Sequence, residues 1–137
     1  MNLEQEITGD LGAFARAGFA SGDVEPDSYT DIDRTVAAGL SLSGKRWGRP
    51  DDTVGFAAIA NAITPIHAEF LDRGGLGILI GDGQLPHPGL QRIIETYYQF
   101  PIYAWKVMLD YQFVANPGYN ADRGPVNVFA ARAHWQF

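Results

Sequence analysis

The sequence contains no cysteine, which excludes disulfide bonds and thiolate metal sites in this chain of 137 residues. It also has no run approaching about 20 apolar residues, so we expect no membrane-spanning helix. Acidic residues outnumber basic ones, 16 to 10, and the formal net charge of −6 disfavours nucleic acid as a partner. The opening segment, MNLEQEITGD, lacks a basic start and an apolar stretch, so no signal peptide is expected within this chain.

Motifs for catalysis and metal binding are missing as well. There is no Gly-x-Ser-x-Gly elbow and no cysteine nucleophile. His67, His87 and His134 are scattered, with no carboxylate or second histidine at ligand spacing, so we predict surface or lumen histidines and no metal site. Glu95 and Asp110 could be a glycosidase pair, but carboxylates are expected on any water-filled face. We therefore expect no enzyme, no catalytic residue and no cofactor.

What the sequence does have is alternation of apolar and polar side chains. In the last segment, VNVFAARAHWQF, the odd positions include Phe129, Trp135 and Phe137, and the even positions include Arg132 and His134. Similar segments of about 9 to 11 residues, the length of a tilted strand crossing a bilayer, recur along the chain. The predicted strands are residues 3–8, 11–20, 31–43, 53–63, 91–100, 105–113 and 126–137.

The connections between these strands alternate in length. Residues 21–30, 64–90 and 116–125 form long connections, whereas 9–10, 44–52 and 101–104 are shorter. Outer-membrane barrels have short periplasmic turns and long extracellular loops, so this phase places the carboxyl terminus in the periplasm. Aromatic residues agree with this orientation, because four of them would lie at the periplasmic membrane interface. They are Phe100, Trp105, Trp135 and Phe137.

The longest connection is predicted to contain a short helix. Thr64 and Pro65 mark its start, Ile66 and Phe70 share one face, and Gly74 marks its end. The segment GGLGILIGDG that follows is a poor phosphate-binding loop, because its glycine spacing is too long and it follows a helix. We expect the helix and the glycine-rich return to pack over or into the mouth of a barrel.

Two fold classes are consistent with the alternation alone. One is a soluble, secreted β-sandwich that binds carbohydrate, in which the apolar faces of two sheets meet in a core. The other is an all-β, antiparallel transmembrane β-barrel, with one short helix in a long extracellular loop. The alternation of short and long connections and the aromatic residues expected at the membrane interface favour the barrel.

Several motifs, taken in order, carry a family resemblance. KRWGRPDDTVG (45–55), GGLGILIGDG (74–83), ETYY (95–98), DYQF (110–113) with Asn116-Pro117, and the final Phe137 resemble the carboxyl-terminal part of carbohydrate-selective porins of the OprB family. The resemblance spans essentially the whole chain. It implies an outer-membrane barrel through which sugars diffuse passively into the periplasm, with GRPDD in a periplasmic turn just before a strand.

The number of strands predicts an incomplete barrel. Seven is odd and lies below the usual minimum of about eight strands for bacterial barrels, and an open sheet in lipid leaves unpaired edges. We therefore expect residues 1–137 to be a single partial domain, non-functional alone, in the bacterial outer membrane. The expected partners are small sugars, outer-membrane lipid, missing strands from the same or another chain, and the insertion machinery acting on the last strand.

The polar side of the predicted strands supplies candidate pore-lining residues. Polar groups of both signs can replace a sugar's hydrogen bonds to water, and an aromatic ring can stack on its C–H surface. The candidates are Arg16, Asp33, Glu95, Tyr97, Lys106, Asp110, Gln112, Arg132 and His134.

Overall fold

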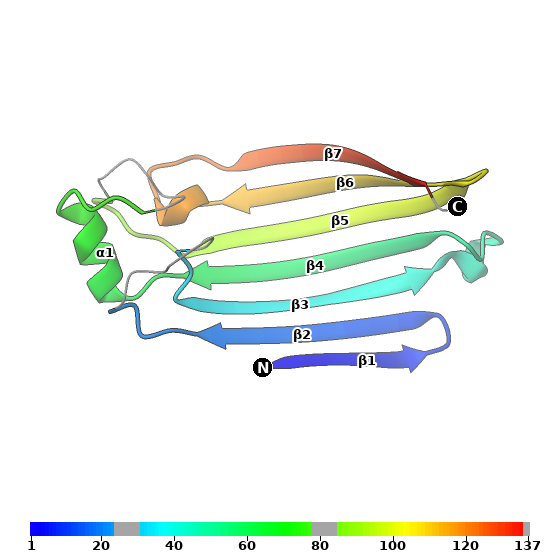
Figure 1. The fold of residues 1–137 in the computed structure, drawn as a ribbon, viewed down its shortest axis with the longest axis horizontal. Helices are drawn as coiled ribbons and strands as arrows, with labels where there is room; N and C mark the ends of the chain where they lie inside the picture. The colour runs from blue at the N-terminus through cyan, green and yellow to red at the C-terminus, as the bar shows by residue number, and fades with distance from the viewer. Residues whose placement is uncertain (24–30, 78–84, 136–137) are drawn as a thin grey trace.

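The computed structural model describes residues 1–23, 31–77 and 85–135, which form one antiparallel sheet of seven strands with a short helix. Each strand pairs with the next along the chain, from β1 to β7 (Figure 1). The elements are β1 (Asn2–Thr8), β2 (Leu11–Phe19), β3 (Arg34–Ser43), η1 (Gly44–Trp47), β4 (Thr53–Ala62), α1 (Pro65–Asp72), β5 (Gln91–Ile102), β6 (Trp105–Ala115), η2 (Pro117–Tyr119) and β7 (Val126–Trp135). The all-β prediction, with its strands and one short helix, is confirmed.

Strand ends differ from the prediction by one residue at β1, β2 and β4, and by more at β3, β5 and β6. β3 begins at Arg34 rather than residue 31, because the side chain of Asp33 binds another connection. β5 and β6 run further than predicted, since Ile102 pairs with Trp105 and only Tyr103 and Ala104 are left to turn the chain. Tyr103 makes this tight turn with a left-handed backbone, at φ 54.

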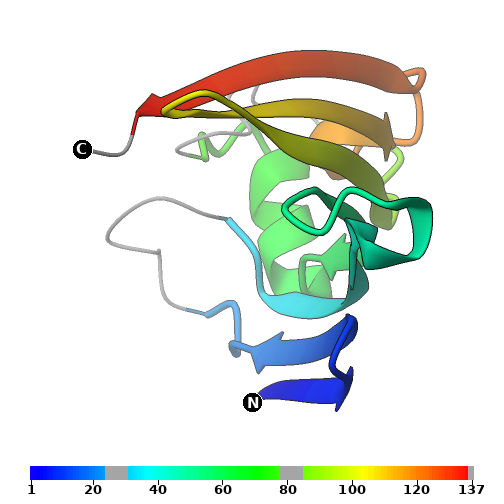
Figure 2. The same ribbon diagram turned by 90° about the vertical axis from the view of Figure 1, so that its right-hand side faces the viewer.

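The sheet curves into an open trough, and α1 lies at one end on its concave side (Figure 2). The shorter connections β1–β2, β3–β4 and β5–β6 lie at one end of the sheet, and the longer connections lie at the other (Figure 1). We call these the turn end and the loop end. The predicted alternation of connection lengths therefore sorts the connections by end.

The register gives the sheet two chemically different faces. Directly opposed residues share a face, and the chain of partners Ala38, Ala58, Ile94 and Phe113 crosses β3 to β6 without a break. The convex face carries large apolar side chains that are exposed. They include Leu3, Phe19, Val36, Leu40, Phe56, Ile94, Trp105, Leu109, Phe129 and Trp135. The concave face carries most of the charged and amide side chains of the strands.

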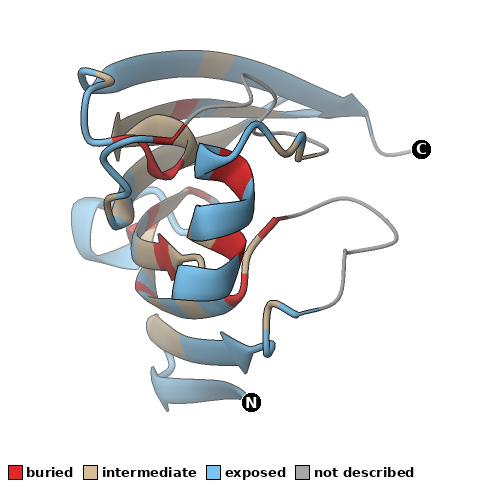
Figure 3. Ribbon diagram, turned by 90° about the vertical axis from the view of Figure 1, so that its left-hand side faces the viewer, coloured by how far each residue is buried: buried red, intermediate tan, exposed pale blue. Residues whose placement is uncertain are grey.

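Few apolar side chains are buried within the described residues. Leu71, Leu85 and Tyr119 form a small core at the loop end, with Ile32 and Ile63 packed against it. Figure 3 shows buried positions on α1 and in the segments beside it. All seven strands belong to one sheet, so the described part has no second sheet to cover the convex face. The β-sandwich alternative, which requires two packed sheets, does not fit.

The helix α1 begins and ends where the sequence predicts. The Thr64 hydroxyl accepts a hydrogen bond from the His67 N–H at 3.4 Å, Pro65 occupies the first turn, and Gly74 follows the end at φ 94. No helix in the described residues is long and apolar enough to cross a membrane.

The buried side of α1 is formed by His67 and Leu71. Ile66 and Phe70 do share a face, but their side chains are exposed, whereas His67 and Leu71 are buried. His67 is buried because its ring contacts the carboxylate of Asp33, which belongs to the connection between β2 and β3. Residues 78–83 of the glycine-rich segment lie outside the described residues.

The connection between β3 and β4 is held by a buried carboxylate. Asp52 is only 2% exposed, and its Oδ2 lies 2.5 Å from Arg49 Nε and accepts a hydrogen bond from the Tyr98 hydroxyl. The Trp47 indole N–H donates in turn to the Tyr98 oxygen, at 3.3 Å. The hydrogen bond from Arg49 holds the pKa of Asp52 below its ordinary value, against the opposing effect of burial.

A second ion pair joins this connection to the neighbouring turn. Lys45 Nζ lies 2.9 Å from Asp10 Oδ1 and donates to the Gly9 carbonyl at 3.1 Å. The Lys45 contact lowers the pKa of Asp10. The segment GRPDD therefore lies in a turn just before a strand, as predicted. The connection that contains it is bonded to β5 through Asp52 and to the β1–β2 turn through Lys45.

We predict that replacing Asp52 with Asn lowers the unfolding temperature of the protein at neutral pH and flattens its acid dependence. The Asp52 pKa is depressed in the folded state, so its stabilisation is present above the ordinary value of 3.8 and is lost as the pH falls through the lower folded pKa. Thermal unfolding from pH 7 to 2 measures this effect. Parallel curves for the wild type and the Asn variant below pH 4 would contradict the assignment.

Candidate functional site

The concave face brings most of the predicted pore-lining residues together. Tyr97 lies directly opposite Asp110, Glu95 opposite Gln112, and Lys106 opposite His134. Arg132, on β7, follows the same face between Ala130 and His134. These side chains form one polar surface across β5, β6 and β7. Arg16 lies on the same face but on β2, and Asp33 lies just before β3.

Two carboxylates, Glu95 and Asp110, lie within this surface. The Gln112 amide donates to Glu95 Oε2 at 3.0 Å. Asp110 is only 6% exposed, and its Oδ2 has no hydrogen-bond partner among the described residues. The surface therefore combines acidic, basic and amide side chains, which can both accept hydrogen bonds from hydroxyl groups and donate to them.

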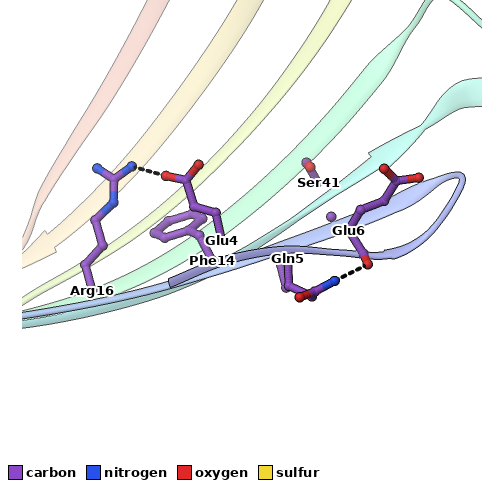
Figure 4. A pocket seen from close by; sticks show the side chains of 8 residues that line it. Glu4, Gln5, Glu6, Phe14, Arg16 and Ser41 are labelled. Carbon is purple, nitrogen blue, oxygen red and sulfur yellow. Dashed lines mark hydrogen bonds and ion pairs between the residues drawn. The ribbon is translucent and has the colours of Figure 1, made fainter. Parts of the chain in front are cut away.

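A second polar group lies on β1 and β2. Arg16 Nη2 lies 3.0 Å from Glu4 Oε1, and Arg16 Nε donates to Asn2 Oδ1 at 3.2 Å. Figure 4 shows Glu4 and Arg16 rising from the concave side, with Gln5 pointing the other way. They border a groove of about 370 Å³. Both charged side chains are more than half exposed, so solvent screens this ion pair.

Glu4 was not among the predicted site residues. Its strand is short, and alternation over so few positions gives little contrast between two faces. The signal present in the sequence is the series Asn2, Glu4 and Glu6, which the register places opposite Arg16, Phe14 and Gly12.

Asp33 differs from the other predicted pore residues because it anchors the helix connection. It is 7% exposed, and its Oδ2 accepts hydrogen bonds from the Thr64 backbone N–H at 2.6 Å and from the Thr64 hydroxyl at 3.0 Å. His67 Nδ1 lies 3.1 Å from the same oxygen. His67 is therefore buried rather than a surface histidine, and its partner lies too far away in the sequence for local spacing to find.

The other long connection is tied to the same end. His87 Nδ1 lies 2.8 Å from Asp122 Oδ2, and the backbone N–H of Gly89 donates to the Tyr119 carbonyl at 2.6 Å. Burial, together with Asp31 and Asp33, raises the pKa of Tyr119. The loop end is thus a connected structure that holds α1 in place. The described residues contain no group of three or more His, Cys, Asp or Glu that could hold a metal ion.

The predicted interface aromatics lie on the convex face at the turn end. Phe100 and Tyr98 have ring centroids 5.8 Å apart, and the rings of Trp105 and Trp135 stack at 6.0 Å. Phe137 lies outside the described residues. The sequence analysis missed Trp47, which joins this group through its hydrogen bond to Tyr98.

One comparison with known proteins gives a match. The profile of a family described as "Carbohydrate-selective porin, OprB family" matches residues 1–137. No curated protein and no solved structure matches this chain.

We predict that replacing Asp33 with Ala loosens α1 while the sheet remains intact. The change removes the acceptor for two Thr64 donors and the partner of His67, and an unsatisfied buried group costs about 1 to 3 kcal/mol. Amide hydrogen exchange in residues 65–72 should accelerate by roughly 5- to 100-fold. Asp72→Ala, on the exposed side of the same helix, serves as the control. Unchanged exchange in the Asp33 variant would refute the anchor.

Proposed function

The chain belongs to the OprB family of carbohydrate-selective porins, and on this premise we propose that it forms part of the wall of an outer-membrane channel for sugars. The family is one of channels rather than enzymes. The observation that carries the proposal is the division of the sheet into an exposed apolar convex face and a polar concave face. In this arrangement lipid contacts one side and solute moves along the other.

The convex face supports contact with acyl chains. Phe56, Ile94 and Leu109 lie in the middle of neighbouring strands, and about half of each side chain is exposed. Large apolar side chains that are exposed together on neighbouring strands are unfavourable in water and mark a contact with a membrane or another protein. The stacked pair Trp105 and Trp135 at the turn end suits the headgroup level of a bilayer.

The concave face supports passive conduction. Residues of both signs, such as Lys106, Asp110 and Arg132, line it at successive heights and can exchange hydrogen bonds with a passing sugar. Conduction requires binding weak enough for the solute to leave, which suits transient contacts to exposed side chains such as those of Lys106 and Arg132. The turn end then faces the periplasm and the loop end faces the outside.

The open edges of the sheet imply further strands. Within the described residues, β1 and β7 are each paired on one side only. Along a strand of about ten residues, roughly half of the backbone groups would lack partners, each at several kcal/mol in hydrocarbon. The sum of tens of kcal/mol exceeds the usual domain stability of about 5 to 15. We infer that strands of the same or another chain close the barrel, and that the insertion machinery engages the last strand.

Sugar permeation tests the proposed function directly. Vesicles that contain the assembled barrel should swell in isotonic glucose at a rate proportional to the glucose gradient. Barrels that insert and fold but leave the vesicles impermeable to glucose would contradict the proposal.

A pair of substitutions on β6 tests the face assignment. Leu109→Arg places a charge on the lipid side and should destabilise the inserted barrel by about 2 to 4 kcal/mol. Gln112→Arg adds the same charge to the concave side, so it should leave assembly nearly unchanged while altering ion conductance. Urea unfolding in vesicles and single-channel recording measure the two effects. Equal loss of stability at both positions would reverse the assignment.

A further inference from the structure

The convex face of the described strands carries only two charged side chains, Arg34 on β3 and Arg92 on β5. The register places every other lysine, arginine, aspartate and glutamate of these strands on the concave face. Those concave residues are Glu4, Glu6, Arg16, Glu95, Lys106, Asp110 and Arg132. The strands of the convex face therefore present positive charge only, although acidic residues outnumber basic ones in the chain.

Both arginines lie at the loop end of the sheet. Arg34 is the first residue of β3 and Arg92 the second of β5, and both strands begin at the loop end (Figure 1). At the turn end, the strands of the same face carry the aromatic residues Phe100, Trp105 and Trp135 and no charge. The two ends of the convex face therefore differ in chemistry.

The separation of these two ends matches the thickness of the apolar part of a membrane. About ten residues of β5 separate Arg92 from Ile102, which is opposite Trp105. At about 3.4 Å per residue and a tilt of about 40°, this length spans roughly 25 Å, the height of the apolar band of an outer-membrane barrel. When Trp105 lies at the headgroups of one leaflet, Arg92 therefore lies at the headgroups of the other.

Neither arginine has an acidic partner among the described residues. The ion pairs found there use other basic side chains. The Arg34 guanidinium lies over the Phe19 ring, 5.6 Å from its centroid. A contact of this kind covers the flat side of a guanidinium and leaves the N–H groups, which lie in its plane, able to donate. Both arginines are exposed, so these donors face the surroundings of the sheet.

A single arginine at this depth needs no ligand, because its long side chain can carry the charge to the water at the headgroups. That explanation applies equally to both leaflets. It accounts neither for the absence of charge on the strands at the turn end nor for two arginines of one sign on either side of the same strand.

The two arginines flank β4, which lies between β3 and β5 (Figure 1). Arg34 is directly opposite Ala62 and Arg92 is directly opposite Ala60, so their Cα atoms are roughly 12 Å apart. The short alanine side chains leave the space between the two long ones open. A guanidinium binds a phosphate through two parallel hydrogen bonds, so this pair suits a lipid that carries two separate phosphates.

We propose that the convex face at the loop end binds a bisphosphorylated glycolipid of the external leaflet, with Arg34 and Arg92 each donating to one phosphate. Such a lipid carries a phosphate at each end of a disaccharide, and its acyl chains would lie against the exposed side chains of Val36 and Ile94. The inference rests on the insertion and orientation given under the proposed function, and it adds a lipid partner that sugar conduction does not require.

The number of phosphates gives the first test, with the assembled barrel in a neutral detergent. Lipid A carries two phosphates, whereas monophosphoryl lipid A carries one and has acyl chains of the same kind. Native mass spectrometry over a lipid titration should show about 5-fold tighter binding of lipid A, which corresponds to about 1 kcal/mol for one basic residue near an anionic lipid. Equal affinity for the two lipids would overturn the proposal.

Removing each charge gives the second test. Arg34→Gln and Arg92→Gln should each weaken lipid A binding by about 5-fold, whereas Arg92→Lys keeps the charge and should retain most of the affinity. Arg132→Gln is the matched control, because it removes the same charge from the concave face and should bind lipid A like the wild type. If Arg132→Gln weakens binding as much as Arg92→Gln, only net charge matters and the site on the convex face is wrong.

A neighbouring barrel is the other possible occupant of this face. Sedimentation equilibrium in the same detergent measures the oligomeric state of the wild type and of the two Gln variants. If these variants change the oligomeric state but leave the affinity for lipid A unaltered, the arginines contact protein and the lipid site is refuted.

Glucose permeation separates failure of the lipid site from failure of the proposed function. A variant with both Arg34→Gln and Arg92→Gln should admit glucose into vesicles at the wild-type rate, because neither arginine lies on the concave face. A wild-type barrel that admits glucose but binds both lipids equally would refute the lipid site alone. A wild-type barrel that admits no glucose but prefers lipid A would refute the proposed function and support the lipid site.

Discussion

The whole structure depends on the unbroken backbone pairing of neighbouring strands. Each strand from β2 to β7 is paired along nearly its full length. Every second side chain of each strand therefore lies on the same face across the whole sheet. A slip of one residue in any pair would transfer that strand's apolar side chains to the polar face. The separation of faces, and with it the proposed channel function, therefore depends on the register of the whole sheet more than on any single residue.

The two ends of the sheet secure this register by polar contacts. A core of three buried apolar residues contributes little hydrophobic stabilisation. Instead, Asp52 joins η1 to β5 at the turn end, and Asp33 joins the start of β3 to α1 at the loop end. Both carboxylates are almost fully buried, and each accepts a hydrogen bond from a donor distant in the sequence, Tyr98 for Asp52 and Thr64 for Asp33. Such contacts suit a sheet whose middle section leaves its apolar side chains exposed instead of burying them in a core.

Strands and their faces could be predicted because a strand's side-chain period is local. The alternation in residues 105–113 needs no knowledge of the neighbouring strands, and Thr64-Pro65 needs only the rules of helix capping. The partner of His67 could not be found in this way, nor could the salt bridge of Glu4, because cross-strand and loop contacts depend on which segments the sheet brings together. Which side of α1 is buried could not be predicted for the same reason.

The alternation of side chains along the sequence thus determined that this chain forms antiparallel strands with one apolar and one polar face, joined by alternating short and long connections. Tertiary structure alone decided which side chains meet across them. Phe14 and Gly39 lie far apart in the sequence, and nothing near either residue indicates that the ring will rest on the glycine. Which two residues face each other across neighbouring strands is set by the hydrogen-bonding register of those strands. The register depends on the packing preferences of all residues in both strands, and not on any one opposed pair.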